Sequence, residues 1–506
     1  MLRSVRTENG LVRGIPAADP RVTAFLGIPF AKPPVGDLRW KAPQPAENWE
    51  GELKCYTFAK INMQTPPGLD PTNIYAREWN VDPTIEMSED SLYLNVWTNA
   101  KTGDEKMPVM VWFFGGGYTA GNTAEMEFDG ERIARRGIVV VTVNYRVAVM
   151  GFLAHPELTA QQPDAPTNFG HLDQRAGILW AKENIAAFGG DPDNITIGGQ
   201  SAGGGSVCAQ LTSPMNDGLF QKAVIISGIV AGVAPNRINA QHSFAEDMAR
   251  GERFFELLGV KTLAEARALP AQYVQDKCNE FDQPFTFTFA TARDGVFQTG
   301  QATDNILHGR YSHMPLFITR TTNEFFMELG AKNMDEFRAE AHRYFGERAE
   351  DFLADCGEDF AEAKRRSAVN ATELAARILT RQQKTLGIPE PVYYGVFDPS
   401  LPGWDDPGAF HSSDLWFWFE TLAKCWRPFK GFHYDLARQM CNYLTNFIRS
   451  GDPNGPDADG VPMPQWRPMR ADEPNAMFLQ DKGCECRIDT PSRIAEILVE
   501  GTVKQL

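Results

Sequence analysis

The sequence predicts an α/β protein built on a large, mostly parallel twisted sheet that helices cover on both faces. After Met107, short apolar runs rich in β-branched residues alternate with stretches of helical pattern. These runs are continuously apolar, which is typical of strands that are buried on both faces. The chain has 506 residues, and a chain of this size buries roughly 75% of its surface on folding. The predicted strands are 109–114, 138–145, 195–197, 223–227, 316–319 and 392–396.

The region before Met107 reads as short strands and turns. It contains the strand-like run 25–30, which is followed by the rigid, proline-rich segment 32–36. We therefore predict a small N-terminal β region that precedes the main alternation. Helical patterns at 130–136 and 173–188 then separate the first strands of the sheet.

The second half of the chain carries a charged helical insertion at 333–384 and a final amphipathic helix at 491–499, which we expect to dock onto the body. We find no internal repeat and no low-complexity linker, and so we predict one domain over 1–506. The apolar residues that recur at roughly helical spacing in the insertion, and that we interpret as packing anchors, are Phe337, Phe345, Phe352 and Phe360.

Composition excludes several classes of function. Acidic residues number 65 against 49 basic ones, which gives a net charge of -16. A nucleic-acid-binding protein needs a basic surface to displace counterions, and no cluster of Lys and Arg supplies one here. No uninterrupted apolar run reaches the roughly 18 residues that a membrane span requires. We therefore expect neither a nucleic-acid partner nor a membrane partner.

Cysteine usage and the N-terminus point to a reducing compartment. The eight cysteines are too sparse for a disulfide scaffold, and the one close pair, Cys484 and Cys486, is a weak metal signal without a nearby histidine. The segment 1–14 lacks the apolar core of a signal peptide. We expect a cytoplasmic protein that holds no metal and no other cofactor.

The most specific motif is the pentapeptide GQSAG at 199–203. It follows the predicted strand 195–197 and precedes a helical stretch through 207–211, which is the strand–turn–helix context of a nucleophile elbow. Glycines at both ends relieve the crowding of such a tight turn. The pattern predicts that Ser201 is a nucleophile and that the backbone N–H of Ala202 is free at a helix N-terminus.

An acyl-transfer nucleophile also needs donors that face the developing oxyanion. The sequence GGG at 115–117 follows the predicted strand 109–114. Glycine lets backbone amides approach a substrate carbonyl without side chains in the way, and so this loop is the candidate oxyanion hole.

These residues resemble the type-B carboxylesterases, a family that includes cholinesterases and bacterial para-nitrobenzyl esterases. The resemblance covers nearly the whole chain and implies the α/β-hydrolase fold. The motifs that carry it are GIPFA (27–31), PPVG (33–36), ED (89–90), LYLN (92–95), GGG (115–117), NYR (144–146), GFL (151–153), DQ (173–174), FGGDP (188–192) and GQSAG (199–203).

The resemblance implies a Ser-Glu-His triad. It assigns Glu324, in TTNEF (321–325), as the acid and His411, in GAFHS (408–412), as the base. It also assigns the amides of Gly116, Gly117 and Ala202 to the oxyanion hole, with Gly115 serving the turn. From the residues alone none of the eight histidines stands out. The fallback acids Asp405, Asp406 and Asp414 read more naturally as turn and cap residues.

The sequence departs from the family pattern in three places. Gln200 stands where the family usually carries Glu beside the nucleophile, so the base lacks an anionic neighbour. Secreted members join two cysteines at the positions of Ser91 and about Asn62, and both are absent here. Trp79 resembles the tryptophan with which cholinesterases hold a quaternary ammonium group, but its spacing to 89–90 differs by two residues. We interpret Trp79 as lining a substrate pocket.

The function that these features predict is a serine carboxylesterase acting on small-molecule esters. One alternative within the hydrolases is an acetyl or feruloyl esterase acting on plant-derived saccharide esters. An alternative from another class is a catalytically silent, cholinesterase-like binding protein, although such proteins characteristically lack a triad member. The sequence does not specify the natural ester.

Overall fold

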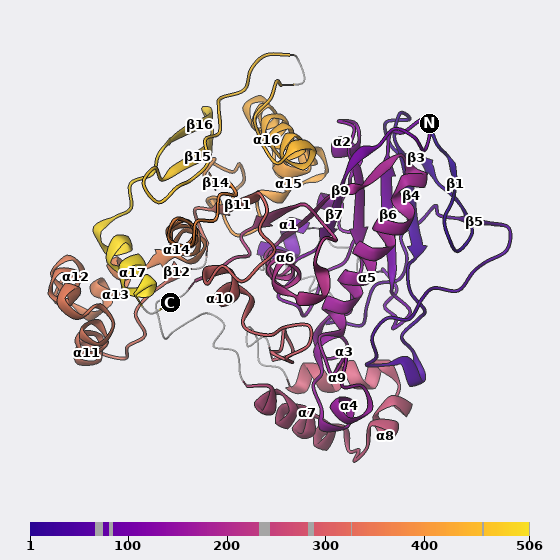
Figure 1. Cartoon of the computed structure of the whole chain (residues 1–506), viewed down its shortest axis with the longest axis horizontal. Helices are drawn as coiled ribbons and strands as arrows, with labels where there is room; N and C mark the ends of the chain where they lie inside the picture. The colour runs from indigo at the N-terminus through magenta and orange to yellow at the C-terminus, as the bar shows by residue number, and fades with distance from the viewer. Residues whose placement is uncertain are drawn as a thin grey trace.

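The computed structural model describes residues 1–65, 74–79, 84–231, 243–281, 288–324, 326–457, 460–504 and 506. Within them the chain forms one 11-stranded sheet in the order β16-β15-β14-β11-β10-β9-β7-β8-β6-β4-β3, with helices on both sides (Figure 1). The α/β class predicted from the sequence is confirmed.

The parallel part of the sheet is the alternation that the apolar runs predicted. Strands β15, β14, β11, β10, β9, β7 and β8 pair in parallel from neighbour to neighbour. Every residue of β8, β10 and β14 is buried, which explains why these runs are apolar without alternation. The bounds are β7 Met107–Phe113, β8 Val139–Val143, β9 Gly190–Gln200, β10 Lys222–Ile226, β11 Leu316–Thr321, β14 Val392–Phe397 and β15 Asn475–Gln480.

Antiparallel strands complete both ends of the sheet. At one end lie β6 (Tyr93–Thr98), β4 (Thr23–Pro29) and β3 (Ile15–Pro16), and at the other lies β16 (Gly483–Ile488). The predicted N-terminal β region is therefore partly an extension of the main sheet. Its remainder is a separate three-stranded sheet made of β1 (Ser4–Arg6), β2 (Leu11–Arg13) and β5 (Glu52–Lys54).

Two groups of helices cover the two faces. Helices α5, α6, α10 and α14 pack in succession on one face, and α2, α15 and α16 pack together on the other (Figure 1). The predicted helix 130–136 is the shorter α2, and the predicted helix 173–188 is α5 continued by a 3-10 turn at Ile185–Phe188. The bounds are α2 Glu131–Ala134, α5 Phe169–Asn184, α6 Ala202–Thr212, α10 Ala302–Leu307, α14 Ala371–Leu386, α15 Leu415–Trp418 and α16 Gly431–Ser450.

The predicted helical insertion is confirmed and forms α11 (Met334–Phe345), α12 (Ala349–Cys356), α13 (Phe360–Ser367) and α14. The final helix, α17 (Arg493–Val503), packs against α11, α12 and α14. The four phenylalanines are packing anchors as expected: the ring of Phe352 lies 5.8 Å from that of Phe337 and 4.6 Å from that of Phe345.

Other helices were not predicted from the strand pattern. Helices α7 (Phe244–Leu258), α8 (Leu263–Ala268) and α9 (Ala271–Phe281) gather beside α4 (Pro156–Gln161) at the lower edge of the view in Figure 1. Two further short helices are α1 (Ile74–Trp79) and α3 (Ala148–Phe152), and α3 packs against α5 and α9. No helix among the described residues is long and apolar enough to cross a membrane.

Candidate active site

Ser201 lies at a sharp turn between β9 and α6, as the pentapeptide predicted. Its backbone has φ 55° and ψ −125°, a region that non-glycine residues rarely occupy. The turn needs the flanking glycines because a Cβ on Gly203 would lie 2.1 Å from the carbonyl oxygen of Phe113, and one on Gly199 would lie 2.3 Å from that of Gly203. Close packing of strand against helix thus holds Ser201 at the carboxyl end of the sheet.

Ser201, His411 and Glu324 form a continuous hydrogen-bonded chain. His411 Nε2 lies 2.8 Å from Ser201 Oγ, and His411 Nδ1 lies 2.6 Å from Glu324 Oε2. All three residues follow parallel strands, Ser201 after β9, Glu324 after β11 and His411 after β14. The fold therefore brings together the three side chains that the family resemblance named.

The backbone ties the acid to the base directly. Asn323 and Phe410, the residues just before Glu324 and His411, form an isolated parallel bridge in which the N–H of Asn323 donates to the carbonyl of Ala409 at 2.9 Å. The N–H of Thr321 also donates to Glu324 Oε1 at 3.3 Å. Both side chains are thus aligned by their own loops as well as by each other.

The electrostatics of the pair keep Glu324 ionised. Burial by itself raises the pKa of Glu324, but the charge of His411 and its hydrogen bond, together with Ser227 and the Thr321 amide, bring that pKa below its ordinary value. An ionised carboxylate at Nδ1 favours the imidazole tautomer whose Nε2 is a hydrogen-bond acceptor, and Nε2 faces Ser201 Oγ.

A second carboxyl group, Asp414, lies near this pair in full burial. It accepts a hydrogen bond from Trp418 Nε1 at 3.0 Å, and burial raises its pKa to about 7. Asp414 is one of the three fallback acids, yet Glu324 occupies the position at His411 Nδ1. Asp405 instead pairs with Arg427, and Asp406 is exposed.

The glycine loop lies against the nucleophile. A Cβ on Gly115 would lie 3.1 Å from Ser201 Cβ and 2.8 Å from the Gln200 carbonyl oxygen, so the loop approaches as closely as its lack of side chains allows. Gly116 and Gly117 adopt positive φ values of 105° and 65°. Within the described part of the chain, the N–H groups of Gly116, Gly117 and Ala202 donate to no protein acceptor.

Gln200 contacts the base from the other side. Its Nε2 donates to Ser412 Oγ at 2.6 Å and lies 3.4 Å from His411 Nε2. An amide in this position supplies a hydrogen-bond donor and no charge. The sequence did not single out Ser412, although its place next to His411 was a signal that could have.

Aromatic rings lie beside the base. Phe410 is buried, and its ring centroid is 6.2 Å from that of Trp79 and 6.2 Å from that of Tyr75. Trp79 is half-buried at the end of α1, and its ring faces Phe410, the residue before His411. Of the segment 63–90, residues 66–73 and 80–83 lie outside the described residues.

The other histidines and the cysteines lie outside the hydrogen-bonded chain of Ser201, His411 and Glu324. His171 is buried between Gln174 and Thr291, and His433 bonds to the amide of Lys430 and the carbonyl of Ser400. His242 lies outside the described residues. No disulfide joins any of the eight cysteines, and the described residues contain no group of three or more His, Cys, Asp or Glu that could hold a metal ion.

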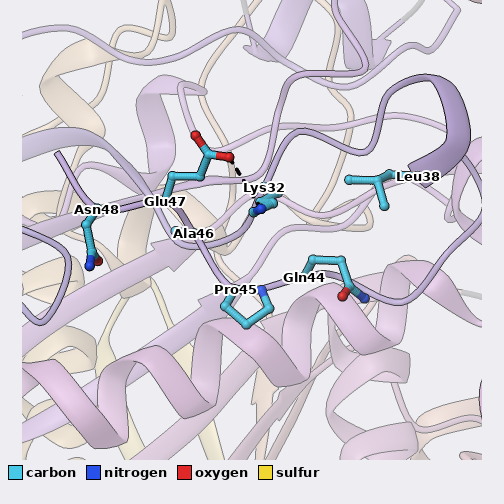
Figure 2. Close-up of a pocket in the computed structure, with 7 residues that line it drawn as sticks. All are labelled: Lys32, Leu38, Gln44, Pro45, Ala46, Glu47 and Asn48. Atoms are coloured by element: carbon cyan, nitrogen blue, oxygen red, sulfur yellow. Dashed lines mark ion pairs between the residues drawn. The ribbon is translucent and has the colours of Figure 1, made fainter.

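A shallow surface pocket of about 510 Å³ shares no residue with the candidate site (Figure 2). Lys32 and Glu47 form a 3.3 Å ion pair across it, and both side chains are largely exposed. The pocket lacks the hydrogen-bonded groups that chemistry at an ester would need. Its lining residues are Lys32, Leu38, Gln44, Pro45, Ala46, Glu47 and Asn48.

Comparison with known proteins places this geometry in context. A model of the carboxylesterase family matches residues 2–385 and 332–495. Fumonisin B1 esterase of Sphingopyxis macrogoltabida is 34% identical over 350 residues, which cover 68% of this chain and 61% of that protein. A cholinesterase of Mus musculus is 42% identical over 227 residues, which cover 44% of this chain and 36% of that protein. The match thus spans less than two thirds of either relative.

A solved structure extends the likeness over the full fold. A PNB esterase superposes with a TM-score of 0.75 at 27% sequence identity, and the match covers 98% of this chain and 100% of that one. The predicted fold, with its sheet, helical insertion and terminal helix, is therefore shared nearly from end to end.

Proposed function

The chain belongs to the carboxylesterase family and has its α/β-hydrolase fold, and from this premise we propose that it hydrolyses small-molecule carboxylic esters through an acyl-enzyme on Ser201. The observation that carries the proposal is the hydrogen-bonded chain from Ser201 Oγ through His411 to Glu324. It has the spacing that a nucleophile, its general base and the orienting acid require.

In the first half-reaction, Ser201 Oγ attacks the ester carbonyl carbon while its proton passes to His411 Nε2. The carbonyl electron pair moves onto oxygen and gives a tetrahedral oxyanion. When this intermediate collapses, the bond to the alcohol oxygen breaks and His411 donates its proton to that oxygen. The alcohol leaves, and the acyl group stays on Ser201.

In the second half-reaction, water attacks the acyl carbon while His411 accepts its proton. Collapse of the second tetrahedral intermediate returns the proton to Ser201 Oγ and releases the acid. Glu324 stays ionised throughout, since burial raises its pKa but His411, Ser227 and the Thr321 amide together hold that pKa below the ordinary value.

The oxyanion would rest on the amides of Gly116, Gly117 and Ala202, whose N–H groups donate to no acceptor among the described residues. Loss of one such donor typically costs about 10²–10³ in rate. No metal or organic cofactor takes part in this mechanism, and Trp79 would line the pocket beside His411.

As part of the same proposal, we place the protein in a reducing, cytoplasmic compartment. The eight cysteines support this because none of them forms a disulfide, whereas secreted chains more often oxidise their thiols in pairs.

The test is steady-state hydrolysis of para-nitrophenyl esters from acetate to octanoate by the wild type and by Ser201→Ala. We expect turnover by the wild type and a fall of about 10⁶-fold in kcat for the variant. The panel should also contain an acetylated xylo-oligosaccharide, a feruloylated saccharide and fumonisin B1, because an esterase relative is named for the last. A well-folded wild type that turns over none of these would refute ester hydrolysis and favour a silent binding protein.

A further inference from the structure

A buried ion cluster joins α1 to the loop before α16. The guanidinium of Arg427 and the carboxylate of Glu78 are both fully buried. Arg427 Nε donates to the two Glu78 oxygens at 2.9 and 2.8 Å, and its terminal nitrogens donate to Asp405 at 3.0 and 3.1 Å. A third acceptor is the carbonyl of Pro402 at 3.1 Å. Arg427 is therefore held by two carboxylates and a backbone group in the interior.

Aromatic rings extend this cluster from the surface to the catalytic loop. The Arg427 guanidinium carbon lies 4.6 Å from the ring centroid of Trp426 and 5.5 Å from that of Phe410. Arg77, which pairs with Asp405, lies 5.5 Å from Trp426 and 4.7 Å from Trp404. Arginine and ring thus alternate in a ladder that starts at Trp404, which is 76% exposed, and ends at Phe410.

The inner end of the ladder reaches the catalytic side chains through the backbone. Phe410 directly precedes His411, and its bridge to Asn323 sets the separation of His411 from Glu324. A shift of Phe410 would therefore move the imidazole against both Ser201 and Glu324. A misplacement of about 1 Å between reacting groups can cost about 10²-fold in rate.

The same arginine also fixes α1. In the described part of the chain α1 spans six residues, Ile74–Trp79, and a helical stretch shorter than roughly 12 residues is marginal in water by itself. Its position therefore depends on tertiary contacts, and two of these are the ion pairs Glu78–Arg427 and Arg77–Asp405. Tyr75 and Trp79, on the same helix, pack 6.2 Å from Phe410. The family's cysteine staple is missing from this part of the chain.

We propose that Arg427 is a positioning residue for both walls of the active site: through Phe410 it sets His411, and through Glu78 it holds Tyr75 and Trp79 against the substrate pocket. The inference rests on the proposed ester hydrolysis. Burying three ionised side chains costs free energy compared with an apolar core. We infer that the cluster is kept because it fixes the positions of the residues on either side of His411.

Two variants test separately how Arg427 acts through Glu78 on α1 and how it acts through Phe410 on His411. Glu78→Gln removes the negative charge that binds Arg427 and keeps the shape of the side chain. We expect it to raise KM by about three- to tenfold, the range of an aromatic contact, and to change kcat less. Arg427→Lys loses the planar fork that binds two carboxylates. We expect it to lower kcat by roughly 10- to 100-fold and to raise KM as well.

The matched control is Arg377→Lys. Arg377 is also buried and also held by two carboxylates, but its hydrogen bonds go to Glu373 and Asp489, and so it joins α14 to the segment after β16. This variant should lower the free energy of unfolding by an amount comparable with Arg427→Lys while kcat and KM stay at their wild-type values. A double-mutant cycle with Phe410→Leu tests the route: the kcat effect of Arg427→Lys should shrink once the ring is removed.

All variants are assayed with the best para-nitrophenyl ester, and unfolding is followed in urea on the full chain. If Arg427→Lys and Glu78→Gln destabilise the protein but keep wild-type kcat and KM, the cluster is structural only and the inference is wrong. If Arg427→Lys does not fold, Glu78→Gln and Phe410→Leu decide: unchanged KM in the first and unchanged kcat in the second would also overturn it. An inert wild type would instead refute the proposed function, on which this inference depends.

Discussion

Gln200 gives His411, the proposed general base, an uncharged neighbour. Its Nε2 lies 3.4 Å from His411 Nε2, close enough for a carboxylate at the same position to stabilise the protonated imidazole. Because the base acts in its unprotonated form, Gln200→Glu should shift the acid limb of the profile of kcat/KM against pH to higher pH.

This shift is measured between pH 5 and 9 with one para-nitrophenyl ester. Gln272→Glu is the matched control, since it adds the same charge on α9, where Gln272 is exposed and donates to the exposed Asp276. The control should retain the wild-type profile. Superimposable profiles for Gln200→Glu and the wild type would show that residue 200 does not influence the base.

The buried carboxyl group of Asp414 leads to a prediction about how the free energy of unfolding depends on pH. Burial raises its pKa in the folded protein from 3.8 to about 7. Between these values the folded protein holds a proton that the unfolded chain has lost, so the free energy of unfolding falls as pH rises from 4 to about 7. Asp414→Asn removes this contribution and should lose less stability than the wild type over that interval.

The prediction is checked by urea unfolding of wild type and Asp414→Asn at pH 5 and pH 8. Comparing the change in unfolding free energy between the two proteins cancels the contributions of the other titrating groups. Glu125, whose pKa burial also raises to about 7, stays in both. Equal pH dependence in wild type and variant would place the charge change at another residue.

At the scale of elements, the packing of α6 against β7 fixes the nucleophile turn. A Cβ on Gly203 would lie 2.1 Å from the Phe113 oxygen and 2.7 Å from the Phe114 oxygen, both backbone atoms that lead into the glycine loop. Gly203→Ala should therefore destabilise the protein by about 1–3 kcal/mol and lower kcat, although alanine is the better helix former.

Gly431→Ala is the comparison for this change. Gly431 opens α16, and a Cβ there would meet nothing within 4 Å. This variant should gain about 0.4–1 kcal/mol and keep full activity. The measurements are urea unfolding and kcat for both. A Gly203→Ala protein as stable and active as the wild type would show that the elbow tolerates a side chain.

Sequence pattern predicted some elements better than others, for physical reasons. The buried strands were predicted because a short, continuous apolar run is a clear signal. The ends of β10, β11 and β14 differ from the predicted ends by at most two residues. Helices α7–α9 were not predicted, although apolar residues such as Phe254, Phe255 and Leu258 recur at helical spacing inside charged sequence, the same signal that predicted the insertion 333–384. Ser201 was predicted from residues alone because a nucleophile elbow is a local structure.

At the scale of the whole molecule, the site depends on contacts that no local pattern contains. Ser201 and His411 are in contact although they lie 210 positions apart in the sequence, and Glu324 and His411 lie 87 positions apart. Family resemblance named these partners, and the sheet brings them together by ending three parallel strands at one edge. The Glu78–Arg427 pair, 349 positions apart, had no signal in the sequence at all.

The central claim is that Ser201 is the nucleophile of an ester hydrolase, and stoichiometric labelling tests it most directly. Diethyl para-nitrophenyl phosphate transfers its phosphoryl group to an activated serine and releases para-nitrophenol. We predict one phosphoryl group per chain, located on Ser201 by peptide mass spectrometry, with esterase activity lost in proportion and no labelling of Ser201→Ala. A label on another residue, or full activity after Ser201 has been modified, would contradict the account.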